Sequence, residues 1–177
     1  MWTTWILLAL LLCWAVGAYN RLIRLRSAAI QAFGALDTHL LRFIALLGEY
    51  ENTRQGADLP PHDPHHALQA AATQYGASLA ALRAQPLDGG AAAALVAARL
   101  VLDTAWQGVV HEAARLNEGV APPALAPWVQ QREQLLLQMA PAAQQFAEAV
   151  AGYNQGIGQF PARLLAWLFG FRKAQAL

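Results

Sequence analysis

The sequence has little cysteine, lysine or charge. Its single cysteine, Cys13, excludes a disulfide within the chain and any paired-cysteine motif. Lys173 is the only lysine. The chain has 12 basic and 11 acidic residues, which gives a net charge of +1. Since nucleic-acid binding needs a concentrated basic surface, this balance argues against a nucleic-acid partner.

Charged residues make up only 13% of the chain, against about 25% in average soluble proteins. Much of the remainder is Ala and Leu, which are strong helix formers, whereas β-branched residues are scarce in the middle of the chain. The composition therefore predicts an all-α protein.

The motifs of common enzyme classes are also missing. The sequence contains no glycine-rich phosphate loop and no nucleophile elbow. His111-Glu112 has Arg115 where a metallopeptidase helix needs a second histidine. We therefore predict no catalytic activity, no catalytic residues and no cofactor.

Residues 2–18 form an uncharged apolar run, which is close to the minimum length that crosses a hydrocarbon core of about 30 Å. Aromatic residues flank the run, namely Trp2, Trp5 and Tyr19, and three arginines follow it at Arg21, Arg24 and Arg26. By the positive-inside rule, this pattern predicts a single-pass membrane protein. The amino terminus would lie outside and the rest of the chain in the cytoplasm.

Two other interpretations of this run are open. Residues 16–18 resemble the small-residue cleavage site of a signal peptide, but no basic segment precedes the run. Cys13 could mark a lipidation site, but bulky Leu12 precedes it. We favour an uncleaved transmembrane anchor over residues 1–18.

After the anchor, apolar residues recur at helical spacing, which predicts a four-helix bundle over residues 19–161. The first helix continues from the anchor to about residue 50, and the others cover about 64–85, 91–117 and 127–160. Gly89 and Gly90 are expected to end the second helix, and Pro141 to kink the fourth. Short loops favour long antiparallel helices in up-down order. An inward-facing Asp37 would need a partner on another helix.

The predicted inward positions are regularly spaced in all four helices. In the first they are Leu22, Leu25, Ala29, Ala32, Leu36, His39, Phe43, Leu47 and Tyr50. In the second they are Leu68, Ala71, Tyr75, Leu79 and Leu82. In the third they are Leu95, Leu102, Trp106, Val109 and Leu116. In the fourth they are Trp128, Leu135, Leu136, Met139, Phe146, Val150, Tyr153 and Ile157.

Two separated motifs resemble the LemA family. The first comprises Tyr19, Asn20, Leu22, Leu25 and Arg26, followed by Ala32, Phe33, Leu36, Asp37, Leu40 and Arg42. The second comprises Tyr153, Asn154, Ile157, Phe160 and Pro161, followed by Leu168, Phe169, Gly170 and Phe171. The resemblance implies a membrane-anchored helical bundle without an established activity, located in the bacterial inner (cell) membrane. The sequence departs from the family pattern at Phe33, Phe43 and Gly48.

Both ends of the predicted bundle carry a Tyr-Asn pair. In an antiparallel arrangement, Tyr19 and Asn20 would meet Tyr153 and Asn154 beside the membrane. We predict a membrane-proximal junction at these residues, together with Arg26, Phe160 and Pro161. The alternative is that each pair closes its own helix independently.

A short apolar segment follows over residues 162–177, at the membrane-proximal end. Its aromatic and basic residues are Trp167, Phe169, Phe171, Arg172 and Lys173. Such a segment suits the headgroup region of a membrane, and we favour this placement. The alternative is that it folds back into the core.

His62, His65 and His66 form the only group with metal-ligand character, and we regard them as weak candidates. A zinc site needs three or four converging ligands, which a proline-rich loop does not obviously provide. The favoured interpretation is a solvated loop with Asp63 as the N-cap of the next helix.

These observations predict a membrane-anchored scaffold or protein-interaction module of the LemA family. Its partners would be the lipid bilayer, through 2–18 and the segment 162–173, and unidentified proteins. Self-association through the wide apolar stripe of the first helix is also open. The alternative is a membrane sensor that binds a small ligand or a metal, at the loop of His62, His65 and His66 or in a crevice of the bundle.

Overall fold

The computed structural model describes residues 2–56, 63–117, 122–160 and 162–177. Within these ranges the chain is all-helical and has no strand, which confirms the predicted fold class. The helices are α1 (Trp2–Gly56), α2 (Asp63–Ala84), α3 (Gly89–Leu116), α4 (Ala126–Gly158) and α5 (Ala162–Leu168).

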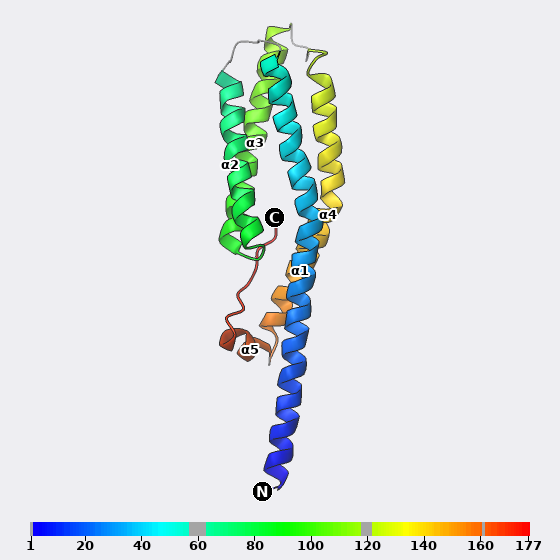
Figure 1. Cartoon of the computed structure of the whole chain (residues 1–177), viewed down its shortest axis with the longest axis vertical. Coiled ribbons are helices and arrows are strands. Elements are labelled where there is room, and N and C mark those ends of the chain that lie inside the picture. Colours follow the sequence, from blue (N-terminus) through cyan, green and yellow to red (C-terminus); the bar gives the residue numbers. More distant parts are fainter. Residues whose placement is uncertain (1, 57–62, 118–121, 161) are drawn as a thin grey trace.

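α1 is one continuous helix of 55 residues, about 80 Å long at 1.5 Å per residue. The predicted end near Tyr50 was wrong, because the helix continues to Gly56. Its amino-terminal part projects alone beyond the other helices (Figure 1). We call the end from which it projects the basal end, and the opposite end, where α1 finishes, the distal end.

Two of the described helices, α1 and α3, are long and apolar enough to cross a membrane. They differ in how far the rest of the protein covers them. The apolar window of α1 is 6% buried, whereas that of α3 is 28% buried. The projecting part of α1 exposes its large apolar side chains, namely Trp2, Trp5, Ile6, Leu7, Leu8, Leu10, Leu11, Leu12, Trp14 and Val16.

The long helices associate in two pairs, α1 with α4 and α2 with α3. α1 and α4 run in opposite directions (Figure 1), and residues 85–88 connect α2 to α3 at the basal end. Gly152 and Gly156 of α4 face Leu25 of α1. A Cβ at Gly156 would lie 2.5 Å from Leu25 Cδ1, so the missing side chain allows the two helices to approach closely here.

Most predicted inward residues are buried or half-buried, and they form one core that includes side chains from all five helices. Leu116 is an exception, because it lies at the carboxy end of α3 and is exposed. Gly89 and Gly90 begin α3 rather than ending α2. The Asp88 carboxylate caps that helix by accepting a hydrogen bond of 2.7 Å from the Ala91 amide.

Aromatic contacts link α1 to α4 and to α2. Phe33 meets Phe146 of α4 edge to face at 5.7 Å, and Phe43 meets Tyr75 of α2 at 6.1 Å between ring centroids. α4 continues through Pro141 without interruption. The kink predicted there stays a prediction.

Candidate functional site

At the basal end, a glycine turn reverses the chain after α5. Gly170 has a φ of 71°, which suits glycine because it has no Cβ. The Phe171 amide donates to the Ala166 carbonyl at 2.8 Å, and the Gly170 amide to the Trp167 carbonyl at 3.4 Å. These two bonds form a Schellman motif, which ends α5 and directs the last residues back toward the long helices.

Asn154 of α4 fixes this returning segment, residues 171–177. Its side-chain amide donates to the Ala174 carbonyl at 2.8 Å and accepts from the Ala174 amide at 2.9 Å. Ala174 is buried, and Leu177 is half-buried against the core. In Figure 1 the carboxy terminus lies between the α2–α3 pair and the α1–α4 pair.

Two side chains of α1 also contact this part of the chain. The Tyr19 ring lies 5.0 Å from Phe169 and 6.4 Å from Phe171, measured between centroids. The Arg26 guanidinium lies 6.0 Å from the centroid of the Phe171 ring, in a cation–π arrangement. The carboxy-terminal segment thus joins α1 to α4 at the basal end.

The structure therefore connects the two Tyr-Asn pairs through a third segment. Among the described residues, no hydrogen bond or ring contact joins Tyr19 or Asn20 directly to Tyr153 or Asn154. Asn20 and Phe160 are exposed, and Pro161 lies outside the described residues. The spacing of the motifs placed the two pairs at one end, and it left open whether the carboxy-terminal segment folds back against the core or lies in the membrane surface.

A cleft of about 610 Å³ opens beside this junction. We call it the basal cleft; its lining residues are Tyr19, Ile23, Arg26 and Ile30 of α1, Ala84 to Asp88, Tyr153 of α4, and Phe169 to Arg172. Burial raises the pKa of Tyr153, with a smaller opposing effect from the Arg26 charge. The phenol is therefore a neutral hydrogen-bond donor at physiological pH.

The carboxy-terminal segment divides between two environments. On α5, Trp167 is 83% exposed and Leu168 67%, while Ala162 and Ala166 face the core. After the turn, Phe171 is half-buried, and Arg172 and Lys173 are exposed. An apolar surface thus lies at the basal end, from which the apolar part of α1 also projects.

An aromatic cluster occupies the distal end. Tyr50 of α1 meets Trp106 of α3 at 5.4 Å and Trp128 of α4 at 5.6 Å, and it stacks on His65 of α2 at 6.1 Å. Burial raises the pKa of Tyr50 to about 12. A mostly apolar pocket of about 270 Å³ lies beside these rings, with Val109, Ala113 and Leu125 in its wall.

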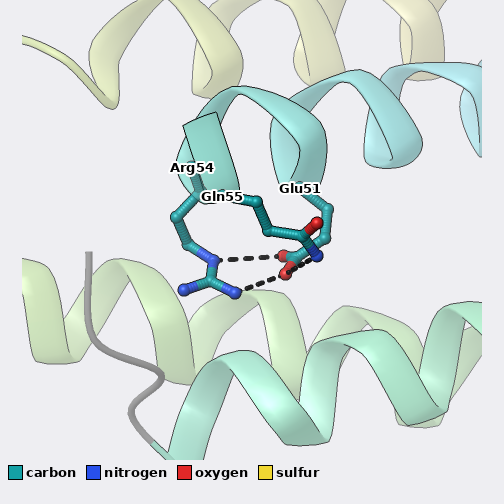
Figure 2. Close-up of polar contacts among 3 residues, drawn as sticks. All are labelled: Glu51, Arg54 and Gln55. Atoms are coloured by element: carbon teal, nitrogen blue, oxygen red, sulfur yellow. Dashed lines mark hydrogen bonds and ion pairs between the residues drawn. The ribbon is translucent and has the colours of Figure 1, made fainter. Parts of the chain in front are cut away.

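The last turn of α1 carries an ion pair next to this cluster. Figure 2 shows the Arg54 guanidinium and the Gln55 amide both directed at the Glu51 carboxylate. The Arg54 Nε–Glu51 Oε2 distance is 3.3 Å. Hydrogen bonding from Arg54 is the main cause of the lowered pKa of Glu51.

A polar bridge between α3 and α4 was not predicted from the sequence. Arg132 pairs with Asp103, which also lies 3.8 Å from Arg99. The Arg132 guanidinium lies 5.7 Å from the ring centroids of both Phe43 and Trp106, and its side chain is only 14% exposed. The available signal was its position, one turn after Trp128 on the inward stripe of the fourth helix.

Asp37 has the partner on another helix that the sequence analysis required. Arg83 of α2 lies 3.2 Å away, from Nε to Oδ2. This contact is one of the few that connect α1 to α2. In the described part of the chain Arg26, unlike Asp37, contacts no ionic partner on another long helix, and its aromatic partner Phe171 is in the carboxy-terminal segment.

His65 and His66 fall on the first turns of α2, and His62 lies outside the described residues. His65 is half-buried against Tyr50, whereas His66 is exposed. Among the described residues, no group of three or more His, Cys, Asp and Glu side chains is placed to hold a metal ion. The side chain of Asp63, the predicted N-cap, is likewise outside the described set.

The described residues define an all-helical protein with a projecting apolar helix and a cleft at its base. Comparison with protein families, with curated proteins and with solved structures found no match.

Proposed function

We propose that this chain is a membrane-anchored helical scaffold or protein-interaction module of the LemA type, without catalytic activity. One observation carries the proposal: residues 2–18 continue directly into a core helix while only 6% of the apolar window of α1 is buried. Exposure of a long apolar surface is unfavourable in water and favourable in a bilayer. The continuous helix would couple the membrane rigidly to the rest of the protein.

The arrangement we propose for the cytoplasmic part is an up-down four-helix bundle. The two helix pairs, the Asp37–Arg83 contact and the aromatic contacts around Tyr50 support it. α5, with its exposed Trp167, would rest in the headgroup layer at the base of the bundle. The outer surfaces of the helices would then be presented to protein partners close to the membrane.

Charged substitutions test the anchor. Leu11 of α1 and Leu100 of α3 are equally exposed, at 65% and 64%. We expect the pair Leu8→Arg/Leu11→Arg to move the protein from the membrane to the soluble fraction of lysed cells. Each arginine costs about 3 kcal/mol at the centre of a span. The matched pair Val96→Arg/Leu100→Arg should leave the protein at the membrane, and the opposite result would assign the span to α3.

Cysteine labelling tests the orientation. In a Cys13→Ser background, Gln107→Cys on α3 provides a single exposed thiol. A membrane-impermeant maleimide should label it only after permeabilisation of the cytoplasmic membrane. Labelling in intact spheroplasts would reverse the proposed topology.

A second candidate function is a sensor of a small apolar ligand, which the distal pocket beside Tyr50 and Trp128 favours. Filling this pocket with Ala113→Leu should abolish any shift of the Trp128 indole resonance on titration with a compound such as cyclohexanol. Ala97→Leu, on an exposed position of α3, is the control. An unchanged Trp128 resonance in the unsubstituted protein would rule out this ligand class.

A further inference from the structure

The basal cleft combines positive charge with aromatic surface. Arg26 of α1 and Arg172 of the returning carboxy-terminal segment both line it. Neither has an ion-pair partner among the described residues. Guanidinium groups bind phosphate oxygens with two parallel hydrogen bonds, which makes an arginine pair a suitable phosphate site.

Asp88 is the acidic residue in the lining, and its carboxylate is already engaged. It accepts a hydrogen bond from the Ala91 amide at the start of α3. The two arginines and Asp88 give the lining a formal charge of +1. A ligand with one negative charge would therefore neutralise the cleft.

The cleft also has the size and the donor groups of a ligand site. Its volume of about 610 Å³ lies within the range of about 300–1,000 Å³ typical of small-molecule pockets. Tyr153 is 2% exposed and contributes a phenol to the wall, while Phe169, Phe171 and Ile23 contribute apolar surface. The lining thus suits a polar, anionic group attached to an apolar body.

The cleft lies next to the apolar run, and this location indicates where such a ligand would come from. Tyr19 follows the last residue of the uncharged run, and the exposed Trp167 and Leu168 of α5 lie at the same end. If residues 2–18 cross the bilayer, the Tyr19 edge of the cleft lies at the depth of the phospholipid headgroups, and Arg26 lies about 12 Å along α1 from the end of that run. A phosphodiester is therefore present there at high local concentration.

We propose that the basal cleft binds the headgroup phosphate of an anionic phospholipid, with Arg26 and Arg172 as its ligands. The inference rests on the proposed membrane anchoring. The bound lipid would bridge α1 and the returning segment, so it would stabilise the base of the protein only when the protein is in its membrane.

Native mass spectrometry of the full chain in detergent tests the proposal. The probes are phosphatidylglycerol, phosphatidylethanolamine and phosphatidylcholine at equal concentration. We expect phosphatidylglycerol to be retained at least fivefold over the other two, and Arg26→Gln/Arg172→Gln to remove this preference. Circular dichroism of each variant should confirm unchanged helicity.

Arg24→Gln/Arg163→Gln is the matched control. Both arginines are exposed and lie outside the cleft lining, and the change in net charge is the same. An equal loss of retention in both pairs would overturn the site and indicate general attraction between charges. Preferred retention of phosphatidylethanolamine would overturn it as well.

Two further arms separate related outcomes. Inorganic phosphate at millimolar concentration should not displace phosphatidylglycerol, and full displacement would assign the cleft to a soluble anion instead. If the unsubstituted protein fractionates with membranes but shows no headgroup preference, the cleft proposal alone is refuted. Recovery of the unsubstituted protein in the soluble fraction would refute the anchoring proposal itself.

Discussion

The two ends of the molecule are closed in different ways. At the distal end, the long helices supply their own closure through Tyr50, Trp106 and Trp128, with the Arg132–Asp103 bridge nearby. At the basal end, a separate segment enters between the helix pairs and is held by Asn154 and Tyr19. The distal closure is made by side chains of the long helices themselves, whereas the basal closure is made by a segment that follows them in the chain.

This difference predicts different kinds of stability. Side chains of the long helices cannot separate without opening the core, so distal contacts should contribute to global stability. A terminal segment can detach by itself, so basal contacts should control local opening. A binding site is better placed at the end that can open, which is where the basal cleft lies.

Arg132→Ala should have the largest effect on global stability. It removes two cation–π contacts and leaves Asp103 without its nearest cation in a partly buried site, at a cost of about 3 kcal/mol. We expect a decrease in Tm of about 8 °C by circular dichroism of the full chain in detergent. Arg115→Ala, which breaks an exposed pair with Glu112, should change Tm by less than about 2 °C. Equal decreases in Tm for the two variants would mean that the Arg132–Asp103 pair contributes no more to stability than an exposed pair does.

Asn154→Ala should release the basal segment without unfolding the helices. The Ala174 amide and carbonyl lose both hydrogen bonds, which costs about 2 kcal/mol, or roughly a thirtyfold change in the opening equilibrium. We expect amide exchange to accelerate by that factor over residues 171–177 and to stay unchanged in the distal half of α1. Gln155→Ala, at the exposed neighbouring position, is the control. Faster exchange throughout the core would show that the segment is an integral part of the fold.

Alkaline pH should affect the distal end more than the basal end. Burial raises the pKa of Tyr50 to about 12 from 10.0, so its phenol keeps its proton in the folded state at a pH where the unfolded chain has lost it. This contribution is complete below pH 10 and is lost as pH rises to about 12, by about 3 kcal/mol at most. Tyr50→Phe should reduce the loss of stability over this interval, as measured by denaturant titration at a series of pH values.

Tyr153→Phe is the basal counterpart of this measurement. Burial also raises the pKa of Tyr153, but by less than it raises the pKa of Tyr50, and a nearby arginine charge opposes the shift at both residues. The substitution should therefore relieve the alkaline loss by less than Tyr50→Phe does. A larger effect at Tyr153 would mean that the basal end is the more tightly packed of the two.

The helices and their inward faces could be predicted because they depend on local spacing. Leu22, Leu36, Tyr75 and Phe146 are all buried as the helical period required. The prediction that Leu116 faces inward is wrong, because periodicity cannot show that the core ends before the helix does. Gly89 and Gly90 were expected to end the second helix, because glycine often follows a helix carboxy end. Here Asp88 caps α3, and the two glycines are its first residues.

The candidate site was predictable in part. Both sequence motifs place Tyr19, Arg26, Tyr153 and Asn154 at one end of an antiparallel arrangement. The returning segment that contacts them was an open alternative, because a short apolar stretch suits either a core or a membrane surface. The structure divides it at Gly170, with an exposed α5 before the turn and a buried Ala174 after it.

The sequence by itself determined the all-helical class, the inward faces and the uncharged apolar run, because each follows from residue type and local period. Only the tertiary structure decided the Arg132–Asp103 bridge, the Asn154–Ala174 clamp and the shape of the basal cleft. Arg132 is 29 residues from Asp103, and Asn154 is 20 residues from Ala174. Contacts over such separations depend on how helices approach one another, and local spacing does not encode that approach.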